Sequence, residues 1–212
     1  MTWTEDRLAT LPAARGVADG ESLIQSPSVG SPLLPRERAA LLAASLASFL
    51  TPFMGASTNV ALPSIARDLA IDAVGMGWIA TAFLLAAAVF LVPFGRIADI
   101  HGRRRVLTWG IAIYALGSAA SALAPSAVFL IAARAFQGVG GAMMFGTSVA
   151  VLTSVFRPER RGAALGINVA AVYLGLSLGP FLGGVLTDHL GWRSIFLANA
   201  GLAVLTGVVV AS

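Results

Sequence analysis

After residue 38 the sequence alternates between long apolar segments and short polar stretches. Each apolar segment is close to the ~20 residues that an α-helix needs to cross ~30 Å of hydrocarbon. Backbone groups left unpaired in lipid are too costly, so such segments must be helical. The short connections between them predict that consecutive helices are antiparallel neighbours. The pattern predicts an all-α polytopic membrane protein with six transmembrane helices, at roughly residues 39–62, 76–94, 106–124, 127–151, 163–187 and 192–211.

The first 35 residues have a different character from the rest of the chain. They are rich in proline and serine, carry scattered charges, and contain no apolar run long enough for the core of a signal peptide. We expect residues 1–35 to be a disordered cytoplasmic tail. Residues 36–212 then form the membrane domain.

The composition excludes a soluble domain. Hydrophobic residues make up 57% of the chain and charged residues 11%, against roughly a quarter charged in a typical soluble domain. The mean hydropathy is +0.84. A soluble protein of 212 residues could not bury so much apolar surface in one core. The absence of cysteine excludes disulfides and thiol catalysis.

The basic residues are all arginine, and their placement matters more than the net charge of +4. Basic chains often bind nucleic acid. Here the arginines follow the positive-inside rule, which accounts for them without a nucleic-acid partner. With the N-terminus inside, both termini are cytoplasmic and Arg67 and Arg193 are outside. The inner side holds Arg36, Arg38, Arg96, Arg103, Arg104, Arg105, Arg157, Arg160 and Arg161.

An internal repeat divides the membrane domain. Residues 95–107 and 184–196 share the spacing Gly-x3-Asp-x2-Gly-x-Arg at an offset of 89 residues, which also places the first apolar segment on the fourth. A chance match in a glycine-rich chain is the alternative. As a repeat, each copy is a three-helix unit, at about 39–124 and about 127–211. Because three is an odd number of spans, the second copy has the opposite orientation in the membrane. Inverted three-helix repeats are typical of secondary transporters.

Four motifs resemble those of the major facilitator superfamily. "GRIADIHGRRRVL" (95–107) resembles its signature loop between the second and third spans. "RAFQGVGGA" (134–142) resembles the fourth-span motif, and "GLSLGPFLGG" (175–184) resembles the antiporter motif of the fifth span. "NVALPSI" (59–65) resembles the end of the first span in drug:proton antiporters, especially the fourteen-span branch. The resemblance covers about residues 39–212.

The resemblance implies the N-terminal six-span half of a secondary transporter in a bacterial or archaeal plasma membrane. The implied function is proton-coupled efflux of drugs or other small organic molecules by alternating access. A proton gradient is the implied energy source, and no cofactor or metal is expected. The expected partners are the lipid bilayer, a small-molecule substrate, and a missing C-terminal half or second chain.

The signature loop holds the first group of candidate site residues. Gly95 and Gly102 would allow a tight turn. Asp99 could cap a helix N-terminus or bind an arginine. The plain interpretation is a topology anchor, whereas the resemblance implies a gating loop formed with Arg103 and Arg104, despite an isoleucine where the family usually has a basic residue.

Arg134 is the second candidate, because a charge deep in a span is costly and suggests a function. Gln137 lies three residues further on, on the same helix face. The alternative is an arginine that extends to the outer headgroups. The resemblance implies proton relay or substrate handling at this position.

The fifth predicted span carries the third candidate, a stripe of small residues. Gly175, Gly179 and Gly183 recur every four residues and would let two helix backbones approach closely. Pro180 would permit a kink. Close packing alone explains this pattern, whereas the resemblance implies that the stripe, with Gly184, seals the pathway against leak.

Asn59, Asn168 and Tyr173 are candidates for lining a cavity, because polar groups in a span should face the interior. An ordinary helix–helix hydrogen bond is an equal alternative for each. One departure concerns coupling: Met54 stands where the fourteen-span antiporters usually carry an aspartate, so the cation recognition and coupling that the family performs through that acid are not implied for this chain. We therefore expect a proton carrier to belong to a C-terminal half.

Three other functions stay open at this point. A metabolite uptake symporter or uniporter of the same superfamily is the first. A membrane-embedded enzyme is the second, although no Cys, His or Glu lies in a predicted span, and His101 and His189 lie in turns on opposite faces. A non-transporting fragment is the third.

Overall fold

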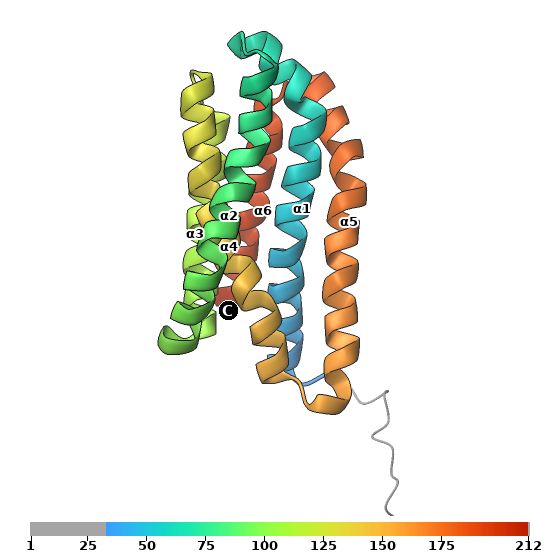
Figure 1. The fold of residues 1–212 in the computed structure, drawn as a ribbon. Coiled ribbons are helices and arrows are strands. Elements are labelled where there is room, and N and C mark those ends of the chain that lie inside the picture. Colours follow the sequence, from blue (N-terminus) through green and yellow to red (C-terminus); the bar gives the residue numbers. More distant parts are fainter. Residues whose placement is uncertain (1–32, 212) are drawn as a thin grey trace, which may run out of the picture. The chain divides into compact units, whose positions relative to one another are not determined.

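The computed structural model describes residues 33–211, and this part of the chain contains helices and no strand. The predicted all-α class is therefore confirmed (Figure 1). Most of the predicted tail, residues 1–32, lies outside the described residues. The helices are α1 (Pro35–Leu69), α2 (Ala73–His101), α3 (Arg103–Ala122), α4 (Ala127–Val155), α5 (Pro158–Leu190) and α6 (Arg193–Ala211).

The helices α1, α2, α4 and α5 extend beyond the predicted apolar segments, because polar residues cap and continue them. The Glu37 side chain accepts a hydrogen bond from the Leu34 N–H at 3.0 Å at the start of α1. Asp72 accepts one from the Gly75 N–H at 2.8 Å at the start of α2. Such caps satisfy N–H groups that have no partner within the helix. Apolarity alone therefore underestimated the helix lengths.

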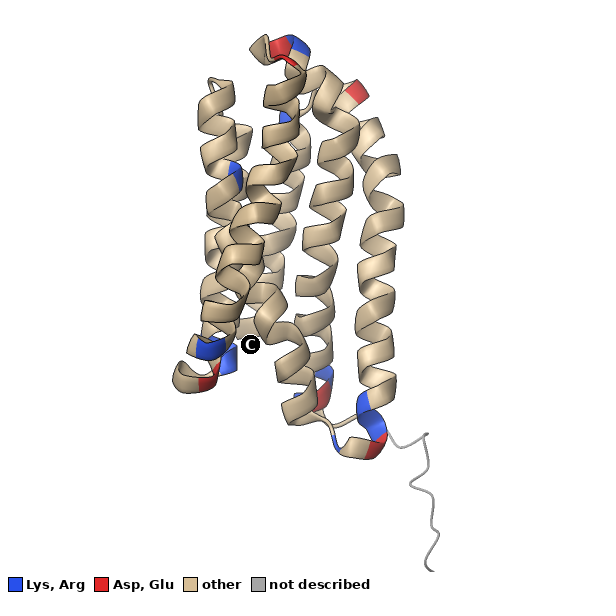
Figure 2. Ribbon diagram, viewed as in Figure 1, with Lys and Arg blue, Asp and Glu red and all other residues tan. Residues whose placement is uncertain are grey.

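Five of the helices are long and apolar enough to cross a membrane: α1, α2, α4, α5 and α6. The helix α3 differs, because its first turn consists of Arg103 to Arg105 and its last residue is Ala122. The prediction of a span over 106–124 was too long by two residues at its end. Figure 2 shows that almost all charged residues lie near the two ends of the helices, so that the middle of the bundle is nearly free of charged residues.

The packing agrees only in part with the prediction that consecutive helices are neighbours: α3 and α4 pack closely, but the other consecutive pairs touch little. α1 packs mainly on α5 and α2 mainly on α4, whereas α1 and α2 touch little, as do α4 and α5. Short connections make consecutive helices antiparallel but do not decide which faces fit together. In the predicted repeat, α1, α2 and α3 correspond to α4, α5 and α6. The pair α1–α5 then corresponds to the pair α4–α2, so the observed packing has the symmetry that the predicted repeat requires.

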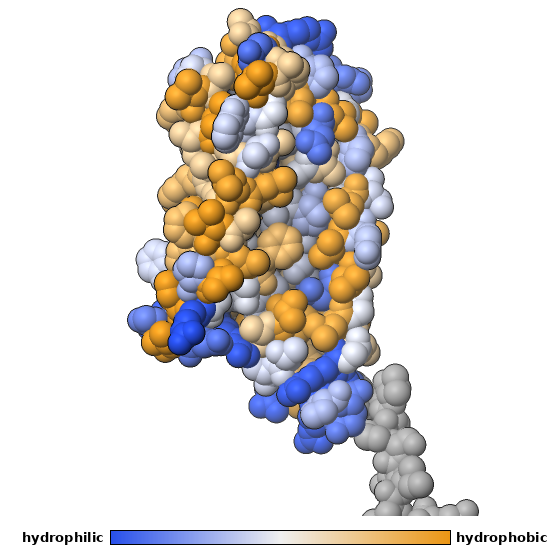
Figure 3. All heavy atoms as spheres, viewed as in Figure 1, coloured by the Kyte–Doolittle hydropathy of each residue, from blue (hydrophilic) through white to orange (hydrophobic). Residues whose placement is uncertain are grey.

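The core lies among α1, α3, α4 and α6. Its largest buried side chains include Leu50, Tyr114, Met144 and Phe196. By contrast α2 and α5 bury few residues, and large apolar side chains such as Phe181 (68% exposed) cover their outer faces. Figure 3 shows apolar side chains across the middle of one face and hydrophilic ones at both ends. Such surfaces suit contact with lipid or with other apolar helices.

Candidate functional site

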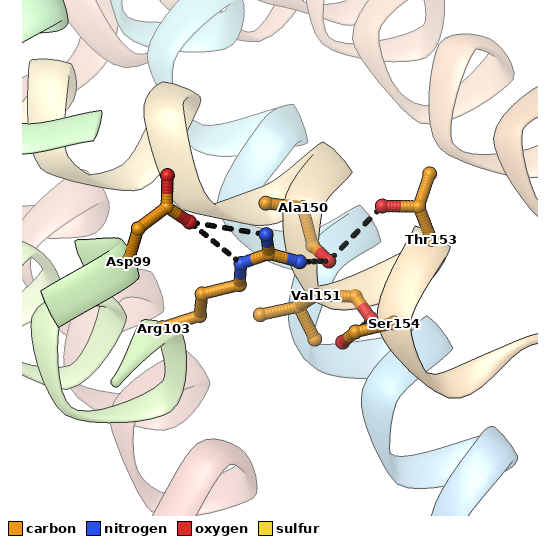
Figure 4. A network of polar contacts seen from close by, with 6 residues as sticks. All are labelled: Asp99, Arg103, Ala150, Val151, Thr153 and Ser154. Carbon is orange, nitrogen blue, oxygen red and sulfur yellow. Dashed lines mark hydrogen bonds and ion pairs between the residues drawn. The ribbon is translucent and has the colours of Figure 1, made fainter. Parts of the chain in front are cut away.

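Arg103 links three helices at one end of the bundle (Figure 4). Its Nε and Nη2 donate to Asp99 Oδ1 at 3.2 and 3.0 Å, and its Nη1 donates to the Ala150 carbonyl at 2.8 Å. Asp99 lies in the last turns of α2, Arg103 begins α3, and Ala150 belongs to α4. Of the two roles expected for Asp99, the structure shows the contact with arginine.

The two glycines of this motif differ in position. Gly102 separates α2 from α3 with a φ of 97°, a conformation that favours glycine. Gly95 lies inside α2, so the prediction that it forms part of the turn was wrong. A Cβ added at Gly146 of α4 would lie 3.6 Å from Gly95 Cα. Gly95 therefore contributes to the close contact between α2 and α4.

Arg104 joins the start of α3 to the last described residues of α6. Its Nε and Nη2 donate to the Val210 carbonyl at 3.1 and 2.7 Å, and Nη2 also donates to the Ala211 carbonyl at 3.1 Å. A guanidinium carries five N–H donors in a fixed fork, so it can bond to two carbonyls at once. The sequence signalled the arginine but not the α6 carbonyls that it binds.

The corresponding arginine of the second repeat is Arg193, at the opposite end of the bundle. Its Nη2 donates to the Ala124 carbonyl just after α3 at 3.2 Å, and its Nη1 donates to Asp68 Oδ2 at 2.6 Å. Trp192 Nε1 donates to the same oxygen at 3.0 Å. The bonds from Arg193 and Trp192 lower the pKa of Asp68, which lies beyond the apolar part of α1. Arg104 and Arg193 thus each bind backbone carbonyls in or just after the third helix of the other repeat.

Arg134 is buried inside the bundle, with 1% of its surface exposed. Its Nη1 donates to Gln137 Oε1 at 2.6 Å and its Nε donates to the Ile79 carbonyl at 3.3 Å. Gln137 Nε2 donates to Ser118 Oγ at 2.6 Å, and Asn199 Nδ2 donates to the same oxygen at 2.8 Å. Four helices contribute to this network, so the alternative of an arginine that extends to the headgroups is wrong.

Aromatic rings complete the surroundings of the Arg134 guanidinium. Its Cζ lies 4.6 Å from the centre of the Phe83 ring and 6.0 Å from that of Phe196. Within the described residues no carboxylate forms an ion pair with Arg134. The charge is held by neutral dipoles and ring faces, which favour a cation but do not neutralise it. Such a site can attract an anion or respond to a nearby change in charge.

Two buried polar atoms near this network have no hydrogen-bond partner among the described residues: Thr51 Oγ1 and Asn199 Oδ1. Tyr114 Oη donates to the Leu50 carbonyl at 3.0 Å on the same side of the core. Sequence reasoning missed Ser118, Tyr114 and Asn199. The available signal for Asn199 was its place as a lone polar amide within the apolar segment 192–211.

The glycine stripe of α5 packs directly on α1. A Cβ added at Gly175 would lie 2.6 Å from the Phe49 carbonyl oxygen, and one added at Gly183 would lie 2.7 Å from Ser57 Cα. Ser57 Oγ donates to the Gly179 carbonyl at 2.9 Å. Pro180 is exposed, Gly184 is half-buried, and α5 continues through both. The close packing expected from the spacing is therefore present.

The candidates for cavity lining have different surroundings. Asn59 and Tyr173 are exposed, whereas Asn168 is buried and its Oδ1 has no partner among the described residues. Met54 is fully buried in the apolar core. A carboxylate at that position would lose its hydration, so the apolar residue suits the site that this chain builds. The cavity-lining role of the three residues stays a prediction.

The family model of the Major Facilitator Superfamily matches residues 44–212. Multidrug resistance protein Stp of Mycobacterium tuberculosis is 39% identical over 166 residues, which cover 78% of this chain and 31% of Stp. Cephamycin export protein CmcT of Amycolatopsis lactamdurans is 42% identical over 166 residues, covering 78% of this chain and 34% of CmcT. Riboflavin transporter RibZ of Clostridioides difficile is 32% identical over 157 residues, covering 74% of this chain and 34% of RibZ. The chain thus spans about a third of the length of these curated relatives.

Among solved structures, the fold is similar to that of the proton:xylose symporter XylE bound to 6-bromo-6-deoxy-D-glucose. The TM-score is 0.74 at 16% sequence identity, and the match covers 82% of this chain and 44% of XylE. At this identity the likeness concerns the fold alone. The helices of this chain are therefore arranged like those in a little under half of XylE.

Proposed function

Because the chain belongs to the major facilitator superfamily, we propose that it acts as the N-terminal half of a proton-coupled exporter of drugs or other small organic molecules. The protein is an integral, multi-pass membrane protein. The observation that carries the proposal is the similarity, over about four fifths of the chain, to relatives whose names state multidrug resistance or export. A transport role requires no catalytic set, and we assign none.

The proposed pathway lies between this half and a second one. In secondary transporters the substrate site lies near the bilayer midplane, where two units meet and rock against each other. The exposed apolar faces of α2 and α5 offer surface for such a contact. The second half would be a C-terminal continuation or a separate chain. The N-terminus would be cytoplasmic, as the arginine distribution predicts.

The contact between Asp99 and Arg103 would act as a gating latch at the cytoplasmic end. It ties the end of α2 to the start of α3 and to α4 through the Ala150 carbonyl. An exposed ion pair is weak and can open and close at little cost. That property suits a contact that holds one access state without trapping it.

Arg134 and Gln137 would relay protons or contact substrate from the middle of the bundle. A buried cation without a carboxylate partner changes the affinity of its surroundings for protons and for anionic groups. The proton gradient would supply the energy, without a cofactor or metal. The glycine stripe of α5 would keep α1 and α5 in close contact during the cycle and limit leak between them.

Dye efflux from vesicles tests the proposal. The whole protein is reconstituted, a proton gradient is imposed, and extrusion of a fluorescent cationic dye is followed with and without an uncoupler. We expect efflux that the uncoupler abolishes. No gradient-driven movement of any of a panel of dyes and antibiotics would contradict the export role.

Uptake by a symporter or uniporter is the second candidate. The apolar Met54, which is buried in the core where the drug:proton antiporters usually carry an acid, leaves this candidate open, whereas the glycine stripe with Pro180 on α5 argues against it. The same vesicles distinguish the two functions by direction: a symporter accumulates substrate when protons enter, whereas an antiporter extrudes it.

A further inference from the structure

A cavity of about 520 Å³ lies at the end of the bundle that holds the first turns of α1 and α3, the last turn of α4, and Val209 and Val210 of α6. This volume falls within the range of small-molecule sites. The end in question carries most of the arginines, so the positive-inside rule places it at the cytoplasmic surface of the membrane. The cavity is separate from the buried network around Arg134, none of whose members lines it.

The walls of this cavity are mostly apolar and come from all four helices. They include Ala40 and Ala43 of α1, Leu107 of α3, Val155 of α4 and Val210 of α6. Within the described part of the chain, no aspartate or glutamate belongs to the lining. The walls can therefore hold a hydrocarbon chain, and they would not repel an anion.

Three arginines also line the cavity: Arg36, Arg103 and Arg104. The Arg103 charge is matched by Asp99. Arg104 is held in place by the Val210 and Ala211 carbonyls, which satisfy part of its donors but leave it without an acidic partner. Arg36 is exposed and forms no ion pair with any described residue. Two guanidinium groups thus remain to bind an anion beside an apolar wall.

We propose that this basic pocket binds the phosphate headgroup of an anionic phospholipid of the cytoplasmic leaflet, with Arg36 and Arg104 as the phosphate ligands. Guanidinium groups match phosphate oxygens in geometry, and basic pockets between transmembrane helices on this side bind such headgroups. A free phosphate would gain nothing from the apolar walls, whereas an acyl chain would. The inference does not depend on the direction of transport or on its coupling ion.

Retention of lipid during purification tests the proposal. The full chain is extracted from membranes with equal amounts of phosphatidylglycerol and phosphatidylcholine, and bound lipid is counted by native mass spectrometry. We expect phosphatidylglycerol to be retained selectively. Arg36→Gln should lower its retention about fivefold, the effect of losing about 1 kcal/mol per arginine. The matched control is Arg38→Gln, in the same turn of α1 but outside the pocket lining, and it should lower retention less than twofold.

A second variant separates the pocket from the surface charge. Ala40→Phe leaves the charges unchanged and fills the apolar part, so it should also remove the bound phosphatidylglycerol. Equal losses in the Arg36 and Arg38 variants, or full retention by Ala40→Phe, would overturn the proposal. If inorganic phosphate alone protects the lipid-free protein against heat and phosphatidylglycerol adds nothing, the site takes a free anion and the lipid assignment is wrong. Circular dichroism checks that each variant is folded.

Discussion

Arg103 and Arg134 make the same kinds of bond in two different regions of the molecule. Each donates to a backbone carbonyl of a neighbouring helix and to a side-chain oxygen close by in sequence. The Arg103 side chain is 37% exposed and its partner Asp99 is 63% exposed. Arg134 is 1% exposed, and its partner Gln137 is a neutral amide.

The difference shows that burial, more than bonding pattern, sets the consequences of losing a contact. At the exposed pair, water and salt replace a lost partner, so such pairs contribute at most about 1 kcal/mol. At the buried network no water is at hand, and a lost acceptor leaves a charge without compensation. We therefore expect changes near Arg134 to affect folding, and changes near Arg103 to affect mainly the balance between access states.

The largest effect is expected from Gln137→Leu, which leaves Arg134 charged and without its acceptor. The free energy of unfolding should fall by roughly 2–3 kcal/mol, measured by equilibrium unfolding of the whole protein in mixed detergent. Adding Arg134→Met should restore part of this loss, because the buried charge that lost its acceptor is then removed as well. A double variant as unstable as the sum of the single ones would show that the pair is not coupled.

An intermediate effect is expected from Asn199→Leu, which removes a neutral hydrogen bond to Ser118 between α6 and α3. Hydrogen bonds between transmembrane helices contribute about 1 kcal/mol at most sites, and unfolding in the same detergent system should show a loss of that size. The control is Asn59→Leu, because Asn59 is exposed on α1. Equal losses in both variants would mean that the buried network adds nothing.

The smallest effect on stability is expected from Asp99→Ala, which removes the exposed ion pair with Arg103. The free energy of unfolding should change by less than about 1 kcal/mol, with membrane insertion intact, while transport in reconstituted vesicles falls several-fold. Asp188→Ala is the matched control, because it changes the corresponding residue of the second repeat at the other end. Normal flux in the Asp99 variant would contradict the gating role.

The helices could be predicted from the sequence because each depends on local properties. An apolar segment in lipid must pair its own backbone groups, so the positions of the spans follow from hydropathy. Their ends were less predictable: caps such as that of Asp72 on Gly75 extend the helices into polar residues. The prediction that Gly95 belongs to the turn was wrong for the same reason, because nothing in the local sequence ends α2 before Gly102.

The hydrogen bonds of the candidate site are likewise of two kinds: some join residues close in sequence and could be predicted, and others join distant residues and could not. The bonds of Arg134 to Gln137 and of Arg103 to Asp99 join residues three and four positions apart, where helix geometry brings side chains together. The partners of Arg104 and Asn199 lie 106 and 81 residues away. No local pattern indicates such partners.

By itself the sequence determined that this chain forms transmembrane helices, that its arginines gather on one side, and that Arg134 is a charge within a span. Hydropathy, charge and helix periodicity are properties of short segments, and they need no knowledge of neighbours. Only the tertiary structure decided that α1 packs on α5 and that Arg134 turns inward to aromatic rings. It also decided that a basic pocket forms where four helices meet. These features depend on the fit of whole helix faces, such as the glycine stripe against Ser57, and that fit exists only when distant segments are in place.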